Sequence, residues 1–181
     1  MNLCVFCGSS SGLNGIYEKT ARDLSKLIGE NNHTLVYGGG NIGLMGILAD
    51  GVLQHKGKVV GVIPEFLVQK EVAHHGLSTL EVVSSMHERK QRMADISDAF
   101  IALPGGWGTL DELAEILTWH QLGLVKKPIG LLNINSYFNF LIQQMDLMVK
   151  EGFLPKETRQ NLTVSETPVN LLTMLGVDFV K

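Results

Sequence analysis

The chain has 181 residues, of which 45% are hydrophobic and 18% are charged. This composition is typical of a compact globular protein and excludes an intrinsically disordered chain, and the length suits one domain over 1–181 with a core that needs neither disulfides nor metals. The net charge is −3 and no basic block is longer than a pair, which argues against nucleic acid as the partner.

At the N-terminus, MNLCVFCGSS has no basic region ahead of its short apolar run, so we do not expect a signal peptide. Further along, no apolar stretch approaches the roughly 20 residues of a membrane helix. We therefore expect a cytoplasmic protein without a membrane partner. Cys4 and Cys7 form a CxxC, but on a strand these residues point to opposite faces, so we predict buried thiols rather than a redox pair.

Apolar runs of strand length alternate with stretches of helical periodicity. Strands are predicted at 3–9, 34–38, 58–64, 80–85, 99–103 and, as the last, 128–134. Helices are predicted at 15–30, 43–56, 86–98, 108–123, 136–152 and near 167–176, with a loop and a short helix over 65–80. This alternation predicts an α/β protein with a Rossmann-like, doubly wound parallel sheet and helices on both faces.

Small residues follow three of the predicted strands, as GSSSG at 8–12, GGGNIGLMG at 38–46 and PGGWGT at 104–109. In doubly wound sheets, ligands bind outside the carboxyl ends of the strands. A glycine-rich turn that opens a helix presents free backbone N–H groups, which bind anions. The three loops therefore predict a phosphate-binding rim at one edge of the sheet.

The second loop contains G-x-G-x-x-G at Gly38, Gly40 and Gly43, a pattern found in dinucleotide-binding proteins. The acidic residue expected about 20 residues later is missing, because position 58 is Lys58 and the next acidic residue, Glu65, comes late. The loop thus favours part of a mononucleotide or its sugar over NAD. Glycines that serve only tight turns and helix packing are the alternative.

The third loop is more specific. Its glycines permit backbone angles closed to other residues, and Thr109 can cap the following helix or bond a phosphate oxygen. Asp111 and Glu112 follow in what we predict to be the first helical turn. Because successive helical residues are about 100° apart, the two carboxylates cannot both face the ligand. One can serve the helix end or solvent while the other reaches past a phosphate toward the sugar.

The segment MHERKQRM at 86–93 carries basic residues on a predicted helix. Arg89 is a candidate phosphate donor or carboxylate partner, because its guanidinium is planar and permanently charged. A solvated basic helix face is the alternative. The histidines show no metal-ligand spacing and no GxSxG nucleophile motif is present, so we expect neither a metal nor a cofactor.

GGGNIGLMG, MHERKQRM and PGGWGTLDE, in this order and at this spacing, resemble the motifs of the LOG family of cytokinin riboside 5′-monophosphate phosphoribohydrolases. The resemblance runs from CGSS to the helix ending near Gly152. It implies a Rossmann-like fold, a homodimer, and hydrolysis of an N6-modified adenosine 5′-monophosphate to free base and ribose 5-phosphate. Such proteins are also labelled lysine decarboxylases, but the sequence shows no context for a pyridoxal-phosphate lysine.

By this resemblance, the essential pair is Arg89 and Glu112. The resemblance also implies nucleotide contacts from Glu71, Lys90, Gly105, Gly106, Trp107, Gly108, Thr109, Leu110, Asp111 and Thr118. Trp107 stands where Tyr is common in the family, and Asp111 where Glu is common. The sequence around Glu71 departs further from the family pattern.

Cleavage of an N-glycosidic bond makes the sugar carbon cation-like in the transition state, and a neighbouring carboxylate stabilises that charge. Glu112 could act electrostatically, as a transient nucleophile, or by orienting the attacking water, and the sequence leaves these roles open. It also leaves open the preferred base. The alternatives to this enzyme are a non-catalytic nucleotide-binding or carrier protein on the same fold and a dinucleotide-dependent oxidoreductase.

Overall fold

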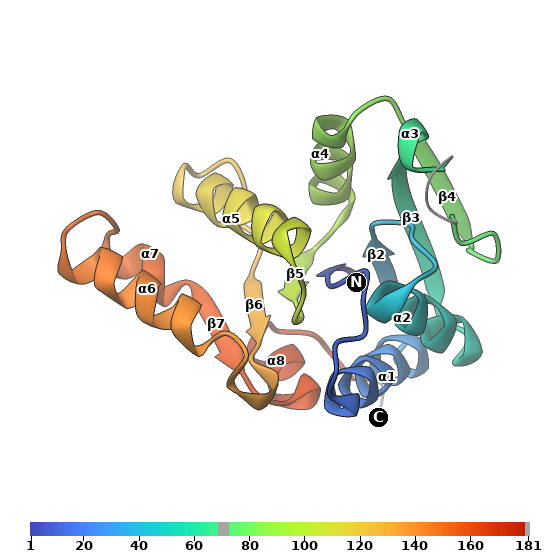
Figure 1. The fold of residues 1–181 in the computed structure, drawn as a ribbon, viewed down its shortest axis with the longest axis horizontal. Helices are drawn as coiled ribbons and strands as arrows, with labels where there is room; N and C mark the ends of the chain where they lie inside the picture. The colour runs from blue at the N-terminus through green and yellow to red at the C-terminus, as the bar shows by residue number, and fades with distance from the viewer. Residues whose placement is uncertain (69–72, 180–181) are drawn as a thin grey trace.

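The computed structural model describes residues 1–68 and 73–179 (Figure 1). Parallel strands form one seven-stranded sheet in the order β4-β3-β2-β1-β5-β6-β7. The strands are β1 (Asn2–Phe6), β2 (Thr34–Tyr37), β3 (Lys58–Pro64), β4 (Thr79–Val83), β5 (Ala99–Ala102), β6 (Ile129–Leu132) and β7 (Leu162–Ser165). The predicted α/β class with a Rossmann-like parallel sheet is confirmed.

Helices cover both faces of this sheet (Figure 1). One layer consists of α1 (Gly15–Glu30), α2 (Gly43–Gln54) and α8 (Pro168–Met174). The other contains α4 (Met86–Ile96), α5 (Trp107–Gln121) and α6 (Asn139–Lys150). The short elements are α3 (Glu65–Val68), the 3-10 helix η1 (Ile134–Ser136) and α7 (Lys156–Gln160). No helix in the described ranges is both long and apolar enough to cross a membrane.

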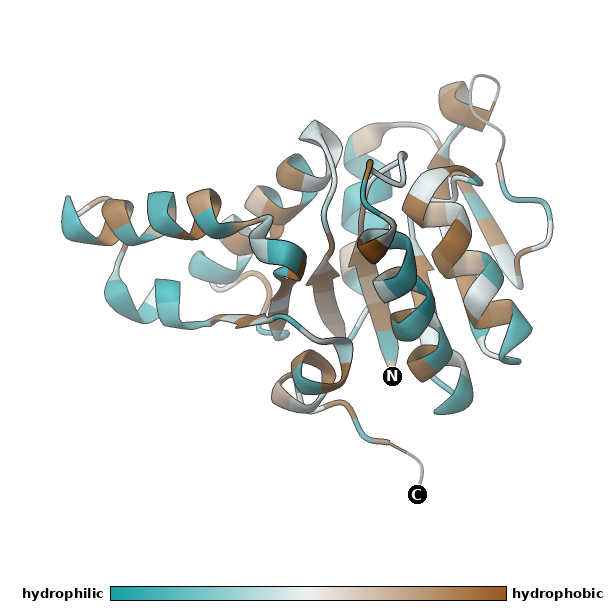
Figure 2. Ribbon diagram, turned by 60° about the horizontal axis from the view of Figure 1, so that its bottom comes forward, coloured by the Kyte–Doolittle hydropathy of each residue, from teal (hydrophilic) through white to brown (hydrophobic). Residues whose placement is uncertain are grey.

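Strand β1 shows how the sheet separates two apolar cores. Leu3 and Val5 face the core under α1, α2 and α8, whereas Cys4 and Phe6 face the core under α4, α5 and α6. Cys7, just beyond the strand, returns to the first core. The thiols of Cys4 and Cys7 are free and buried, as predicted. Figure 2 shows the central strands coloured as hydrophobic and the helices with one polar side, which is the pattern of a sheet buried on both faces.

The C-terminal third differs from the sequence prediction in two places. The sheet continues past the strand predicted as the last, because β7 pairs with β6. This strand was missed because it has only four residues at the sheet edge and only Leu162 is buried. The helix predicted over 136–152 begins instead at Asn139, because Asn135 and Ser136 adopt left-handed φ values of 51° and 58°.

The strand order reverses between β1 and β5, and this reversal positions the site. β1 leads through α1 to β2 on one side of the sheet, whereas β5 leads through α5 to β6 on the other. The chain therefore diverges beyond the carboxyl ends of these two strands and leaves a crevice there. Such a switch point is where doubly wound sheets bind their ligands.

Candidate active site

The glycine loops meet at this crevice and touch one another through their backbones. The Gly8 N–H donates to the Pro104 carbonyl at 3.2 Å. A Cβ atom on Gly105 would lie 2.8 Å from the Gly8 nitrogen, and one on Gly43, whose φ is +59°, would collide with the Ser9 backbone. Glycine is therefore required at these positions for the loops to pack so closely.

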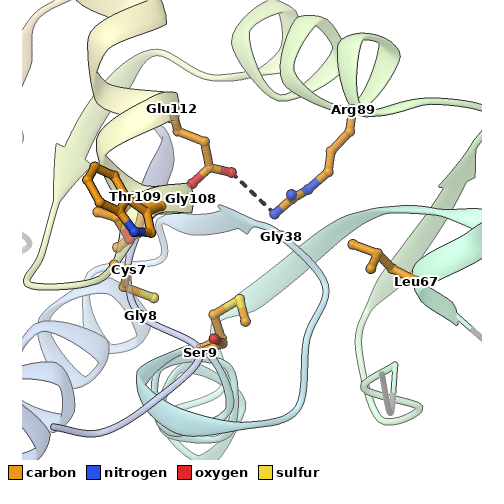
Figure 3. Close-up of a pocket in the computed structure, with 13 residues that line it drawn as sticks. Cys7, Gly8, Ser9, Gly38, Leu67, Arg89, Gly108, Thr109 and Glu112 are labelled. Atoms are coloured by element: carbon orange, nitrogen blue, oxygen red, sulfur yellow. Dashed lines mark ion pairs between the residues drawn. The ribbon is translucent and has the colours of Figure 1, made fainter. Parts of the chain in front are cut away.

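A cleft of about 240 Å³ opens between these loops and helices α4 and α5 (Figure 3). Among the described residues that line it, Arg89 and Glu112 are the charged side chains, and they lie beside glycines of all three loops. Met45 on α2 and Leu67 on α3 add apolar side chains to its lining. Figure 3 shows Leu67 on the opposite side of the cleft from Thr109, so the cleft has a helix-terminus side and an apolar side.

Arg89 and Glu112 point toward one another from α4 and α5 (Figure 3). Arg89 Nη2 lies 3.2 Å from Glu112 Oε1, and the two side chains are only 11% and 9% exposed. Two further contacts hold the guanidinium in place. Its Nε donates to the Val62 carbonyl at 3.2 Å, and its Nη1 contacts Met86 Sδ at 3.7 Å. Arg89 thus lies inside the cleft, and the alternative of a solvated basic face is wrong for this residue.

Burial raises the pKa of Glu112 to about 6, because loss of water disfavours the carboxylate more than the charge of Arg89 favours it. Within the described ranges, Oε1 accepts no hydrogen bond of good geometry, even though Arg89 is close enough to attract it. Burying a carboxylate oxygen that accepts no hydrogen bond reduces the stability of the folded protein. At pH 7 this group is mostly ionised and available to a ligand.

The N-terminus of α5 supplies the other half of the cleft. The helix begins at Trp107 after Gly106, and no side chain caps it. Leu110 makes the first backbone bond, to the Gly106 carbonyl at 3.2 Å. The N–H groups of 107–109 and the buried Thr109 hydroxyl therefore have no partner in the part of the chain described. These unsatisfied donors at a positive helix end form an anion cradle, a term used below for 106–109.

Within the described part of the chain, a Cβ atom on Gly106 or Gly108 would meet nothing within 4 Å, so the backbone of the cradle is accessible there. Since α5 begins at Trp107, Asp111 and Glu112 lie in the second helical turn, and their predicted place in the first turn is wrong. The extra turn separates the carboxylate from the cradle. It leaves room for a sugar between a phosphate on the cradle and Glu112.

Lys90 and Asp111, the neighbours of this pair in sequence, face a different direction. Lys90 Nζ lies 3.2 Å from Asp111 Oδ2 and 3.1 Å from Glu115 Oε1, and the Asp111 side chain is 58% exposed. Neither Lys90 nor Asp111 lines the cleft. The expectation that the two carboxylates diverge is confirmed, and the implied contacts of Lys90 and Asp111 with a nucleotide stay predictions.

The remaining predicted contacts are scattered. Trp107 stands at the mouth of the cleft and is 88% exposed. Leu110 packs against the core under α4, α5 and α6. Thr118 donates to the Ala114 carbonyl at 2.7 Å and lines a groove between α5 and α6, away from the cleft. Glu71 lies outside the described residues.

The site residues that were not predicted individually include Val5, Cys7, Met45, Leu67 and Val62. Their positions at strand ends or on neighbouring helices give no local sequence signal. Gly38 was predicted as part of a motif, but its reason is new. A Cβ atom there would collide with Arg89 Nη2 and lie 3.1 Å from Arg89 Cζ, so only glycine leaves space for the guanidinium.

Known proteins are similar to this sequence over nearly its whole length. A family model described as "Possible lysine decarboxylase" matches residues 45–175. A cytokinin riboside 5′-monophosphate phosphoribohydrolase of Arabidopsis thaliana is 44% identical over 173 residues, which are 96% of this chain and 80% of the relative. A probable enzyme of the same name from Oryza sativa subsp. japonica is 46% identical over 173 residues, 96% of this chain and 71% of the relative. The chain belongs to the LOG family.

Solved structures show the LOG-family fold in proteins with different names. A molybdenum cofactor binding protein of Rippkaea orientalis superimposes with a TM-score of 0.72 at 21% identity, covering 97% of this chain and 94% of that one. A molybdenum cofactor carrier protein of Chlamydomonas reinhardtii gives a TM-score of 0.72 at 19% identity, covering 97% and 95%. At these identities the likeness establishes the fold alone.

Among the residues that the structure describes, no group of three or more His, Cys, Asp and Glu side chains could hold a metal ion. Cys7 lines the cleft, but burial and the nearby Glu112 charge raise the pKa of its thiol well above the usual range. The thiol is therefore neutral and a poor nucleophile.

Proposed function

We propose that this protein hydrolyses the N-glycosidic bond of N6-modified adenosine 5′-monophosphates, releasing the free base and ribose 5-phosphate. The relatives that are 44–46% identical over nearly the whole chain bear the name of this activity. The observation that carries the proposal is the buried Arg89–Glu112 pair one helical turn beyond an open anion cradle. Phosphate recognition and a cation-stabilising carboxylate are the two elements this reaction needs.

The cradle orients the substrate. A 5′-phosphate bound to the free N–H groups of 107–109 and the Thr109 hydroxyl satisfies donors that are otherwise left without partners. This anchor holds the ribose against the second turn of α5, where Glu112 lies. Fixing the sugar beside the carboxylate lowers the entropic cost of reaching the transition state.

Glu112 then stabilises the positive charge that develops at C1′ as the bond to the base breaks. Its carboxylate acts in the ionised form, whether it stays electrostatic, attacks C1′, or orients water. Arg89 supports that form, because its positive charge lowers the Glu112 pKa against the effect of burial. The ion pair also fixes the direction of the carboxylate, while the Val62 carbonyl fixes the direction of the guanidinium.

The base lies on the side of the cleft away from the cradle. Met45 and Leu67 line the cleft, and Leu67 lies across it from Thr109. Apolar side chains there suit an apolar substituent on N6 better than the bare amino group of AMP, because they gain from burial and offer no hydrogen bond. We therefore propose that N6-alkylated substrates are preferred over AMP.

We also propose that the protein is a homodimer whose subunits associate through the face formed by α5 and α6. We propose the cytoplasm as its location. An apolar groove of about 270 Å³ runs between these helices, lined by Leu117, Leu141 and Met148. Phe140 and Phe153, nearby in sequence, are 83% and 84% exposed. Exposed large apolar side chains beside a groove are typical of interaction surfaces. Sedimentation of the wild type and of Phe140→Asp tests this, with a dimer and a weakened dimer expected.

The decisive experiment is chromatography of products after incubation with AMP, N6-isopentenyl-AMP and the matching nucleosides. We expect free base and ribose 5-phosphate from the monophosphates and at least about 100-fold slower release from the nucleosides, because these lack the anchoring phosphate. Equal release from nucleosides would contradict the role of the cradle. Tight nucleotide binding without any product would favour the carrier alternative.

A further inference from the structure

The segment that begins at Ala73 is hydrogen-bonded to the second glycine loop, at 38–40. Ala73 and Gly40 form an isolated antiparallel bridge, and the His74 N–H donates to the Gly39 carbonyl at 3.1 Å. The His74 side chain is buried, although its neighbour His75 is exposed. Residues 39–40 of the loop and 73–74 of this segment thus form a short antiparallel ribbon at the edge of the cleft.

Both ring nitrogens of His74 are engaged. The Gly76 N–H donates to Nδ1 at 3.1 Å, so Nδ1 is an acceptor and the proton of the neutral ring sits on Nε2. Nε2 donates to Asp50 Oδ1 at 2.9 Å, on helix α2. The ring is therefore fixed in orientation between the ribbon and a rigid helix.

The loop that is held in this way lies against the guanidinium of Arg89, which comes from α4. Gly38 lies directly against Arg89, with no space for a Cβ atom between them. Gly39 has a φ of +77°, and a Cβ atom there would lie 3.1 Å from Ile63 and 3.4 Å from Leu80, so the loop also packs closely against β3 and β4. A run of three glycines has high backbone entropy and no side chains to fix itself. Contacts with residues outside the loop must therefore fix its position.

We propose that His74, held by Asp50, is a positioning residue that keeps the 38–40 loop against Arg89 and so holds the guanidinium in line with Glu112. The inference rests on the proposed function only for its kinetic readout. Asp50 itself is 71% exposed, so its hydrogen bond with His74 adds little to global stability. Its effect is local, on the placement of the loop.

The test compares His74→Ala with His75→Ala, the adjacent exposed histidine, and Asp50→Ala with Asp50→Asn. We expect kcat on N6-isopentenyl-AMP to fall by about 10-fold to 100-fold in His74→Ala and less in Asp50→Ala, with small changes in KM, since misplacing a catalytic group by about 1 Å has effects of this size. Asp50→Asn keeps an oxygen acceptor for Nε2–H and should restore most of the activity. His75→Ala should match the wild type.

The pH profile separates positioning from simple loss of structure. With Arg89 displaced, less positive charge acts on Glu112, so the Glu112 pKa rises and the acid limb of kcat/KM moves upward from about 6 in His74→Ala. The other charges that act on Glu112, those of Lys90, Asp111 and Glu115, are unchanged in all four variants. A reduced rate with an unmoved acid limb would overturn the proposal, as would wild-type behaviour of both His74→Ala and Asp50→Ala.

A crystal structure of Asp50→Ala gives a result independent of any activity. We expect the 38–40 loop to shift and the distance from Arg89 Nη2 to Glu112 Oε1 to exceed its present 3.2 Å. An unchanged loop and ion pair would refute the positioning role of His74 and Asp50, called the clamp below, even if the enzyme is active. Absence of hydrolysis in the wild type, with this shift present, would refute the proposed function and leave the clamp intact.

Discussion

Two sets of ion pairs join the same two helices, the inner pair Arg89–Glu112 and the outer contacts of Lys90, and they differ most in their carboxylates. Arg89–Glu112 is about one-tenth exposed and faces the cleft, whereas Lys90 bridges to Asp111 and Glu115 at the outer side, where Asp111 is 58% exposed. Each member of one pair is the sequence neighbour of a member of the other. On α5, the 100° step between neighbouring residues turns Glu112 into the cleft and leaves Asp111 exposed to solvent.

The comparison shows which carboxylate is left with an unsatisfied oxygen and a raised pKa, and is therefore available for chemistry. The outer pair is satisfied by its partners and by solvent, and pairs of this kind contribute little to stability. The inner pair leaves Glu112 with a pKa near 6 and an oxygen without a hydrogen bond, which are features that cost folding energy. Such a cost is expected at functional sites, where a substrate supplies the missing partner.

The largest expected effect is on the inner pair itself. Glu112→Gln and Arg89→Met should each fold, yet lose at least about 100-fold in kcat/KM, because the first removes the negative charge that stabilises the transition state and the second removes the cation that keeps Glu112 ionised and oriented. Base release measured by chromatography, with melting temperature as the folding control, provides the test. Near-wild-type turnover by either variant would remove that residue from the mechanism.

The next effect comes from crowding the same pair without touching it. Gly38→Ala adds a methyl group in the space of the Arg89 guanidinium and should reduce kcat by about 10-fold to 100-fold. Gly15→Ala is the matched control, since a Cβ atom there meets nothing within 4 Å. Equal kinetics for the two alanine variants would show that the guanidinium can move at no cost.

The third effect is on pH dependence. Because Glu112 acts ionised and burial raises its pKa to about 6, kcat/KM should be constant above this value. It should then fall by about tenfold for each pH unit below it. Stopped assays in overlapping buffers between pH 4.5 and 8 (about the range in which the fold is expected to persist) measure this limb. A limb near the ordinary glutamate value would contradict burial as the cause.

The smallest effect is expected at the outer pair. Lys90→Met should change kcat and KM by less than about threefold, since a partly exposed link between helices contributes little. The resemblance to the LOG family instead implies that Lys90 contacts the nucleotide. A large rise in KM would show that Lys90 leaves Asp111 and Glu115 when substrate binds, and would erase the contrast between the two pairs.

Much of this arrangement was predictable from the sequence, because it depends on local patterns. Periodicity and small-residue loops identify the sheet and its ligand edge, and helical geometry predicts that Asp111 and Glu112 diverge. The short edge strand β7 and the left-handed turn at Asn135 lack such patterns. Leu67, Met45 and the clamp at His74 depend on contacts between distant segments, which a single sequence does not encode locally.

The most direct measurement of the central claim is a crystal structure of Glu112→Gln with bound AMP. The account predicts the 5′-phosphate on the N–H groups of 107–109, the ribose over the second turn of α5, and C1′ within about 3.5 Å of the residue 112 side chain. A phosphate bound elsewhere, or a C1′ far from this side chain with the cradle empty, would contradict it.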